Sequence, residues 1–521
     1  MKLRPGRHHG PAGALLVAGT HSDAGKSLVT AGLCRWLQRQ GVSVAPFKAQ
    51  NMSLNSIVAK GGFEIGRAQA MQAAAARIEP EVAMNPILIK PSGTDHSQVI
   101  VMGRPYADVT ATSYRPMTDE LRPIVSEALA QLQARYDVVI CEGAGSPAEI
   151  NLRRSDLVNM GLARQAGLPV ILVGDIDRGG VFASLLGTVA ALSPQDQAHV
   201  AGYVINKFRG DHSILAPGLD MIKDLTGRPV LGVLPFVDDL HLDAEDSLAI
   251  ERPRPQREAD RAAGTLDVAV VRLGWMSNFT DLDALACEPG VRVRFTRSPV
   301  DVERADLVVV PGTKATVEDL GRLRSSGLAD ALIERSRCDD PILGICGGYQ
   351  LLGESIFDDV ESGAGEVHGL GLLPVSTTFR EQKVLRNVTG HSALLGSDVG
   401  GYEIRHGRPR IIGAGGAPLI TLDGSDDLEG CVVGATLGTS WHGLLEHDDA
   451  RRALLRWTAQ QRGIDFTPAP ATSFAAEREA QLDRLGDLID AHLDTAQLLR
   501  LLEAGAPLAL PTVELTLRQA G

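Results

Sequence analysis

At 521 residues the chain is too long for one ordinary hydrophobic core, and its length predicts about three domains. Its 51 basic and 64 acidic side chains give a net charge of -13, which argues against nucleic acid as a partner. The sequence has no apolar stretch of about 18 residues, no signal-peptide cleavage pattern and only six cysteines, so we expect a cytoplasmic protein without membrane contact or a disulfide framework.

The first half of the chain alternates short apolar runs with amphipathic stretches. Residues 1–12 are basic and are expected to be disordered, whereas 13–250 carry the alternating pattern. The stretch 27–40 has helical spacing and ends before Gly41, a natural helix stop. Alternation of strand and helix predicts an α/β fold with a parallel, doubly wound sheet. The expected strands are 14–19, 42–47, 136–143, 169–176, 200–207 and 229–236.

A charged, proline-broken segment at 251–265 is expected to be a linker. The α/β pattern then restarts and predicts a second domain over 266–460, with strands at 266–274, 291–296, 306–313 and 341–348. The remaining residues, 461–521, begin rich in Pro and Ala and continue as amphipathic helix. We expect a helical tail there and assign it no function.

A phosphate-binding loop is predicted where GTHSDAGKS (19–27) joins the first strand to the first helix. In this setting backbone N–H groups and a helix N-terminus bind phosphates, Lys26 would reach the β- and γ-phosphates of ATP, and the Ser27 hydroxyl would ligate Mg²⁺. The first glycine of the usual pattern would fall at Thr20 but lies at Gly19, a variant that resembles dethiobiotin-synthetase-like enzymes. The candidate ATP-binding residues are Gly19, Thr20, Ser22, Asp23, Ala24, Gly25, Lys26, Ser27 and Asn206.

A switch ATPase is the rival interpretation of this loop. Partitioning ATPases carry an additional lysine, which would fall at His21. Because that lysine is missing, the non-enzymatic switch is the weaker alternative.

Polar residues follow the expected strands at their carboxyl ends. Glu142 would face the phosphate loop as a second Mg²⁺ ligand or a base. Asp175 and Asp177 occupy a similar position, where each would contact either a metal ion or the substrate. Asn206 and Lys207 end another strand, where they would recognise the edge of the adenine base.

A cysteine nucleophile is predicted in the second half. Residues 344–348 read G-I-C-G-G between a strand and a helix, the tight turn that exposes a nucleophile, so Cys346 is the candidate. A helix N-terminus favours its thiolate. The N–H groups of Gly347 and Gly312 are the candidates for the oxyanion hole.

His442 is the candidate base and proton donor. It follows a strand-like segment near the end of the same domain and, with the cysteine turn, resembles class I glutamine amidotransferases over 266–450. That family places Glu two residues after the histidine, but here the position is Leu444, a loss shared with the cobalamin-pathway amidotransferases. The group that orients His442 stays open. The competing histidines are His368, His406 and His447.

Four N-terminal blocks, 47–56, 64–76, 85–103 and 141–152, closely resemble the cobyric acid synthase family. The resemblance implies a glutamine-hydrolysing ligase that uses ATP, Mg²⁺ and glutamine. Its implied reaction is amidation of the b, d, e and g side-chain carboxylates of adenosylcobyrinic acid a,c-diamide, through acyl phosphates. Cobyrinic acid a,c-diamide synthase, which shares the phosphate loop and the amidotransferase half, is the alternative enzyme.

The implied substrate is a corrinoid polycarboxylate, so basic and amide side chains near the phosphate loop are candidates for binding it. The order of amidation, the route of ammonia and homo-oligomerisation stay open. The substrate candidates are Lys48, Asn51, Asn55, Arg67, Lys90, Arg153, Asp175 and Arg178.

Overall fold

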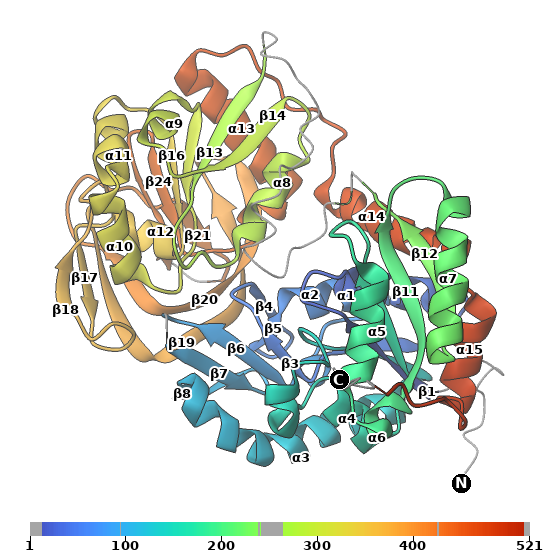
Figure 1. Cartoon of the computed structure of the whole chain (residues 1–521). Coiled ribbons are helices and arrows are strands. Elements are labelled where there is room, and N and C mark those ends of the chain that lie inside the picture. The colour runs from blue at the N-terminus through green and yellow to red at the C-terminus, as the bar shows by residue number, and fades with distance from the viewer. Residues whose placement is uncertain (1–12, 94, 238–239, 241–263, 425–426, 515–521) are drawn as a thin grey trace, which may run out of the picture.

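The structure is a computed structural model that describes residues 13–93, 95–237, 240, 264–424 and 427–514. The predicted disordered start, 1–12, and residues 251–263 of the predicted linker lie outside the described residues. Two α/β bodies lie side by side, one from each half of the chain (Figure 1).

The first body is built on a six-stranded sheet with the order β12-β11-β10-β1-β9-β2. Every pair is parallel, and the strands are rich in buried aliphatic residues, as is typical of a sheet covered on both faces. The six predicted strands and the parallel sheet are thus confirmed. Their bounds are β1 (Gly13–Gly19), β2 (Val44–Phe47), β9 (Val138–Glu142), β10 (Val170–Asp175), β11 (Val200–Phe208) and β12 (Val230–Pro235).

The position of β1 determines where ligands can bind. It lies between β9 and β10, so the carboxyl ends of these three strands meet at one point of the sheet edge. In doubly wound sheets, ligands bind at such a point. The helices of this body are α1 (Lys26–Arg39), α2 (Arg67–Ala75), α3 (Ala111–Arg135), α4 (Met160–Ala166), α5 (Val181–Ala191), α6 (Pro194–Gln197) and α7 (His212–Thr226).

Two small sheets, which the sequence did not predict, occupy residues 50–109. One has the order β3-β6-β7-β8, and the other is the hairpin β4-β5. Val58 of this hairpin packs with Tyr402 and Ile404 of the second body. These strands are therefore part of the contact between the two bodies. Their bounds are β3 (Gln50–Met52), β4 (Ser56–Ala59), β5 (Phe63–Gly66), β6 (Ile87–Pro91), β7 (Ser97–Val101) and β8 (Arg104–Val109).

The second body contains a six-stranded sheet with the order β14-β13-β15-β16-β24-β23. All pairs are parallel except β23 with β24. The carboxyl ends of β15, β16 and β24 are neighbours, so the loops that follow them meet. The strands are β13 (Leu266–Val271), β14 (Val291–Thr296), β15 (Leu307–Val310), β16 (Ile342–Ile345), β23 (Cys431–Val433) and β24 (Thr436–Thr439).

A mainly antiparallel sheet, also not predicted, lies beside this one. Its long strands β19 (Val375–Ser392) and β20 (Ser397–Ile411) pair over most of their length, and both contact β4. The remaining strands are β17 (Ser355–Asp358), β18 (Gly365–His368), β21 (Ile420–Leu422) and β22 (Leu428–Glu429). The helices are α8 (Asp283–Ala286), α9 (Pro299–Arg304), α10 (Thr316–Ser325), α11 (Leu328–Arg337), α12 (Gly347–Leu352) and α13 (Asp448–Arg462).

The helical tail returns to the first body. Helix α14 (Phe474–His492) packs along α1, and α15 (Thr495–Ala504) contacts β1, as Figure 1 shows at the edge of that body. A Cβ added to Gly32 of α1 would lie 2.8 Å from Ile489 Cγ1, so the two helices are in close contact. Trp36 Nε1 also donates to Asp490 Oδ1 at 3.0 Å. The tail therefore completes the core of the first body.

Candidate active sites

The predicted phosphate loop lies at the carboxyl end of β1 and leads into α1. Gly25 has a φ of 103°, and a Cβ there would lie 2.0 Å from Asn206 Nδ2, so both the backbone and the space require glycine. Lys26 Nζ donates to the carbonyls of His21 at 3.0 Å and Gly145 at 3.2 Å. The lysine thus lies across its own loop, where its ammonium group can bind phosphate oxygens.

Asn206 lies beneath this loop. Its Nδ2 donates to the carbonyl of Ala24 at 3.0 Å, and the side chain is buried. This contact supports the loop, so it accounts for the position of Asn206 without an adenine. Binding of adenine by this residue stays a prediction.

Ser27 and Glu142 meet as expected for a magnesium site. Ser27 Oγ donates to Glu142 Oε1 at 2.8 Å, and Lys48 Nζ lies 3.0 Å from the same oxygen. Gln72 Nε2 donates to Oε2 at 2.5 Å. Burial would raise the pKa of Glu142, but Lys48 and these hydrogen bonds lower it, so the carboxylate is charged.

A hydroxyl and a carboxylate side by side fit Mg²⁺, which takes oxygen ligands and completes its shell with phosphates and water. Among the described residues no group of three or more His, Cys, Asp and Glu is arranged to hold a metal ion. A site built from Ser27, Glu142 and nucleotide phosphates does not need such a group.

A charged cluster borders the loop on its β10 side. Lys207 Nζ lies 2.5 Å from Asp175 Oδ2 and donates to the carbonyl of Asp23 at 2.7 Å. The guanidinium of Arg178 pairs with the Asp23 carboxylate at 3.0 Å. Arg209 Nε lies 3.5 Å from Asp177 Oδ1. The structure thus brings the predicted strand-end residues to the nucleotide side of the sheet.

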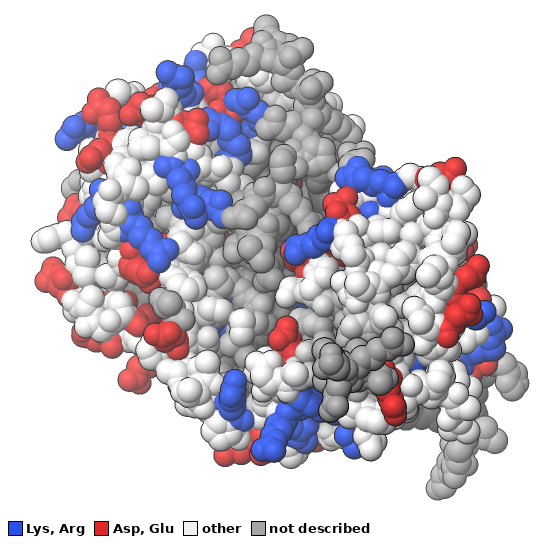
Figure 2. All heavy atoms as spheres, viewed as in Figure 1, with Lys and Arg blue, Asp and Glu red and all other residues white. Residues whose placement is uncertain are grey.

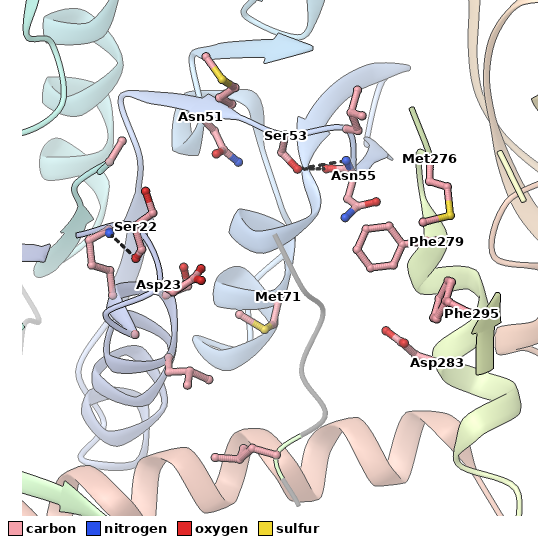
Figure 3. A pocket seen from close by; sticks show the side chains of 18 of the residues that line it. Ser22, Asp23, Asn51, Ser53, Asn55, Met71, Met276, Phe279, Asp283 and Phe295 are labelled. Carbon is pink, nitrogen blue, oxygen red and sulfur yellow. Dashed lines mark hydrogen bonds between the residues drawn. The ribbon is translucent and has the colours of Figure 1, made fainter. Parts of the chain in front are cut away.

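A large cavity of about 2950 Å³ opens between the two bodies next to the phosphate loop. Figure 2 shows Lys and Arg side chains on both bodies, on either side of the boundary between them. Figure 3 shows Asn51 and Asn55 on one wall, with Met276 and Phe279 opposite Asn55. Six of the predicted substrate residues line this cavity: Lys48, Asn51, Asn55, Arg153, Asp175 and Arg178.

Two predicted substrate residues are placed elsewhere. Arg67 Nη2 pairs with Glu446 Oε1 at 2.6 Å, and Nη1 lies 3.4 Å from Tyr402 Oη, so Arg67 joins the two bodies. Lys90 is buried against Glu64, at 2.6 Å. Neither residue lines the large cavity. Corrinoid binding by these two residues stays a prediction that their position outside the large cavity does not support.

Cys346 lies in the predicted tight turn between β16 and α12. Its φ of 51° and ψ of -107° are strained for a residue with a side chain. A Cβ on Gly348 would lie 1.9 Å from the Val310 carbonyl oxygen, so the turn packs against the end of β15. The flanking glycines thus permit the strained turn, as the sequence predicted.

The two predicted oxyanion glycines lie in neighbouring loops. A Cβ on Gly347 would lie 2.8 Å from the Thr313 backbone nitrogen. A Cβ on Gly312 would lie 3.1 Å from His442 Cε1, so this loop also borders the histidine. The arrangement brings both glycines to Cys346 and His442, where a tetrahedral oxyanion would form.

Asp281 supports His442, a contact that no motif in the sequence indicated. It lies in the 3₁₀ turn Phe279–Leu282, and its Oδ2 is 2.7 Å from His442 Nδ1, while Oδ1 accepts from the Gly443 N–H at 2.9 Å. Burial opposes the charged imidazole, but the charges of Asp281 and Cys346 outweigh burial and raise the pKa of His442 to about 10. Cys346, His442 and Asp281 thus lie as a nucleophile, a base and an orienting carboxylate would.

The position expected for glutamate cannot serve this function. Leu444 is buried in an apolar cluster with Trp441 and Leu445. Asp281 lies 161 residues before His442, in a short turn without any motif, so spacing along the chain gave no signal. Tyr402, which stacks on the His442 ring at 5.5 Å, was missed for the same reason.

The competing histidines lie in other surroundings. His406 lines the small cavity at Cys346, and burial lowers its pKa, but its Nδ1 is 2.9 Å from the Arg380 carbonyl oxygen. His368 is exposed at the end of β18, and His447 precedes α13. His442 alone of these four lies against an aspartate in the described residues.

A phosphate loop with an adjoining carboxylate and a Cys–His–Asp centre define a glutamine-hydrolysing ligase. Family comparisons agree: residues 15–249 match the CobQ/CobB/MinD/ParA nucleotide binding domain, and 267–450 match the CobB/CobQ-like glutamine amidotransferase domain. No described helix is long and apolar enough to cross a membrane.

Curated relatives named cobyric acid synthase match nearly the whole chain. The Streptomyces coelicolor protein is 59% identical, covering 96% of this chain and 98% of its own. The Streptomyces avermitilis protein is 57% identical, with 96% and 99% covered, and the Rhodococcus jostii protein is 56% identical, with 97% and 98% covered. The chain belongs to the cobyric acid synthase family.

Proposed function

We propose that the chain amidates side-chain carboxylates of a corrinoid in cobalamin biosynthesis, using ATP and glutamine. The substrate is adenosylcobyrinic acid a,c-diamide, and amidation of its b, d, e and g carboxylates gives adenosylcobyric acid. We expect this reaction in the cytoplasm.

In the ATP half, a corrinoid carboxylate oxygen attacks the γ-phosphorus and ADP leaves, which gives an acyl phosphate. Lys26 binds the β- and γ-phosphate oxygens, and Ser27 and Glu142 would hold Mg²⁺, which offsets phosphate charge when bound. Lys48 pairs with Glu142 and therefore also lies close to the phosphate-binding site. Ammonia then attacks the activated carbonyl, the amide forms, and inorganic phosphate leaves.

In the glutamine half, Cys346 Sγ attacks the side-chain amide carbon of glutamine. His442 gives its proton to the leaving nitrogen, so ammonia departs and a glutamyl thioester remains. The N–H groups of Gly312 and Gly347 stabilise the oxyanion. Water then hydrolyses the thioester, with His442 as base and Asp281 holding its ring.

The large cavity suits the substrate class. It lies between the bodies, adjoins the phosphate loop, and is lined by both basic and amide side chains. Arg153, which is held by Asp196 at 2.6 Å, and Arg178 offer charge to carboxylates, whereas Asn51 and Asn55 offer hydrogen bonds to corrin amides.

One observation carries the proposal: relatives named cobyric acid synthase align over nearly full length with a chain in which both reactive centres are assembled. Mass spectrometry of corrinoid products, with ATP, Mg²⁺ and glutamine, tests it. We expect four successive acid-to-amide conversions on the a,c-diamide. Conversion of only two carboxylates, on the unamidated acid, would instead indicate an a,c-diamide synthase.

A further inference from the structure

Two cavities lie back to back at the contact between the bodies. The small cavity, of about 40 Å³, contains Cys346 and Gly347, and the large cavity contains the phosphate loop. On β6, Ile89 and Pro91 line the large cavity, whereas Lys90 lines the small one. Successive side chains of a strand point to opposite faces, so this strand forms part of the wall between the cavities.

The opposite side of the wall also contributes residues to both cavities. Met276 and Phe279 line the large cavity, whereas Ser277 and Asn278 line the small one. Figure 3 shows the large-cavity side, where Asn55 faces Met276 and Phe279. The wall is therefore one layer of residues thick at this place.

The two sides of the wall are joined by buried hydrogen bonds. Asn278 Oδ1 accepts from the Ser56 N–H at 2.8 Å, and Lys90 Nζ donates to Ser56 Oγ at 2.8 Å. Ser56 is fully buried, and Asn278 and Lys90 are nearly so. These three residues thus form a buried polar contact across the wall.

Two lysines share one carboxylate in this wall. Lys90 Nζ and Lys383 Nζ each lie 2.6 Å from an oxygen of Glu64, which is fully buried. Burial lowers the pKa of Lys383 to about 8, while both lysines hold the pKa of Glu64 far below its usual range. Two ammonium groups around one carboxylate give this trio one net positive charge.

We propose that ammonia crosses between the two sites at Ser56, Asn278 and Lys90, and that the positive charge of Lys90, Lys383 and Glu64 keeps it neutral as it crosses. The proposal rests on the function proposed above. A buried cation repels a second cation strongly, because little water screens the charges, so ammonium is excluded. Neutral ammonia carries no such penalty, and only the neutral form can attack an acyl phosphate.

Charge-matched variants test this proposal in the full chain. The measured quantity is the amide formed per glutamate released, with alanine dehydrogenase, pyruvate and NADH present to convert ammonia that escapes into solution to alanine. Wild type should give a ratio near one. Lys383→Met leaves the trio neutral and should lower the ratio at least threefold. Adding Glu64→Gln to Lys383→Met restores one positive charge and should restore most of the ratio.

Lys314→Met is the matched control, because Lys314 lines the same small cavity but pairs with Glu361. Its ratio should equal that of wild type. Lys383→Gln also leaves the trio neutral but keeps a hydrogen-bond donor beside Glu64, and it repeats the test in case Lys383→Met does not fold. In every variant, amidation with added ammonium in place of glutamine is measured as well. Its persistence shows that the ATP-using half is folded.

Two results would overturn the proposal: an unchanged ratio in Lys383→Met, or a double variant that couples no better than the single one. A raised KM for glutamine at an unchanged ratio would show that these lysines bind glutamine instead. Failure of the proposed function looks different, because wild type would then form no corrinoid amide even with added ammonium.

Discussion

Asp281→Asn tests the carboxylate that completes the glutaminase centre. The substitution keeps the size of the side chain but removes its charge, and the Asn amide can then donate a hydrogen bond to His442 Nδ1. With the amide oxygen toward the ring instead, His442 keeps its proton at Nδ1, as in the present 2.7 Å contact, but loses the negative charge that stabilises it.

The size of the effect follows from the interaction that is lost. A hydrogen bond to a charged, buried group contributes about 1.5–3 kcal/mol, and each 1.36 kcal/mol is a factor of ten in rate. We therefore expect glutamine hydrolysis to fall roughly 10- to 150-fold. A larger loss, as in serine proteases with the equivalent change, would indicate that the tautomer itself is wrong.

The pH dependence of kcat/KM for glutamine distinguishes loss of the Asp281 charge from a general disruption of the site. Because Asp281 helps to raise the pKa of His442 to about 10, the alkaline limb of kcat/KM for glutamine should shift to lower pH in Asp281→Asn. Asp283→Asn, two residues later at the start of α8, is the control and should keep the wild-type limb.

The assay is glutamate release in the presence of ATP, Mg²⁺ and corrinoid, with ammonium-supported amidation measured in parallel. We expect the second activity to persist in Asp281→Asn. A wild-type rate and an unshifted alkaline limb in this variant would refute the reasoning, because His442 would then be oriented by another group.

Further predictions concern the phosphate loop, the missing glutamate and the tail. Lys26→Ala should abolish amidation with either nitrogen source, measured by corrinoid mass spectrometry; amidation that persists would remove Lys26 from the ATP site. Leu444→Glu should lower stability by about 3 kcal/mol, without raising glutaminase activity, because a charge is then buried among apolar residues; denaturant unfolding measures this. Ile489→Ala should cost about 2–5 kcal/mol of unfolding free energy, and Asp490→Asn only about 1; equal costs would contradict the packing role of α14.

The sequence predicted the parts of the fold that depend on local pattern. All six strands of the first sheet, and the turns at Lys26 and Cys346, follow from apolar runs bounded by glycine. These features are short in sequence, and each one determines its own backbone conformation. These strands and turns could therefore be predicted without knowledge of the rest of the chain.

The missed features all depend on contacts between distant segments. The β19–β20 hairpin lacks a continuous apolar run, since its buried residues alternate with charged ones. Asp281 reaches His442 only because the turn after β13 passes the end of β24. The contacts of Arg67 with Glu446 and Tyr402 span more than 300 residues, so the sequence did not indicate them.

One short helix links both reactive centres. At its start, Arg67 of α2 contacts Tyr402, whose ring stacks on His442. One and a half turns later, Gln72 donates to Glu142, beside Ser27 of the phosphate loop. Because α2 is only nine residues long, displacement of one end is carried to the other. A substitution in α2 must therefore be assayed in both half-reactions before its effect is assigned to either.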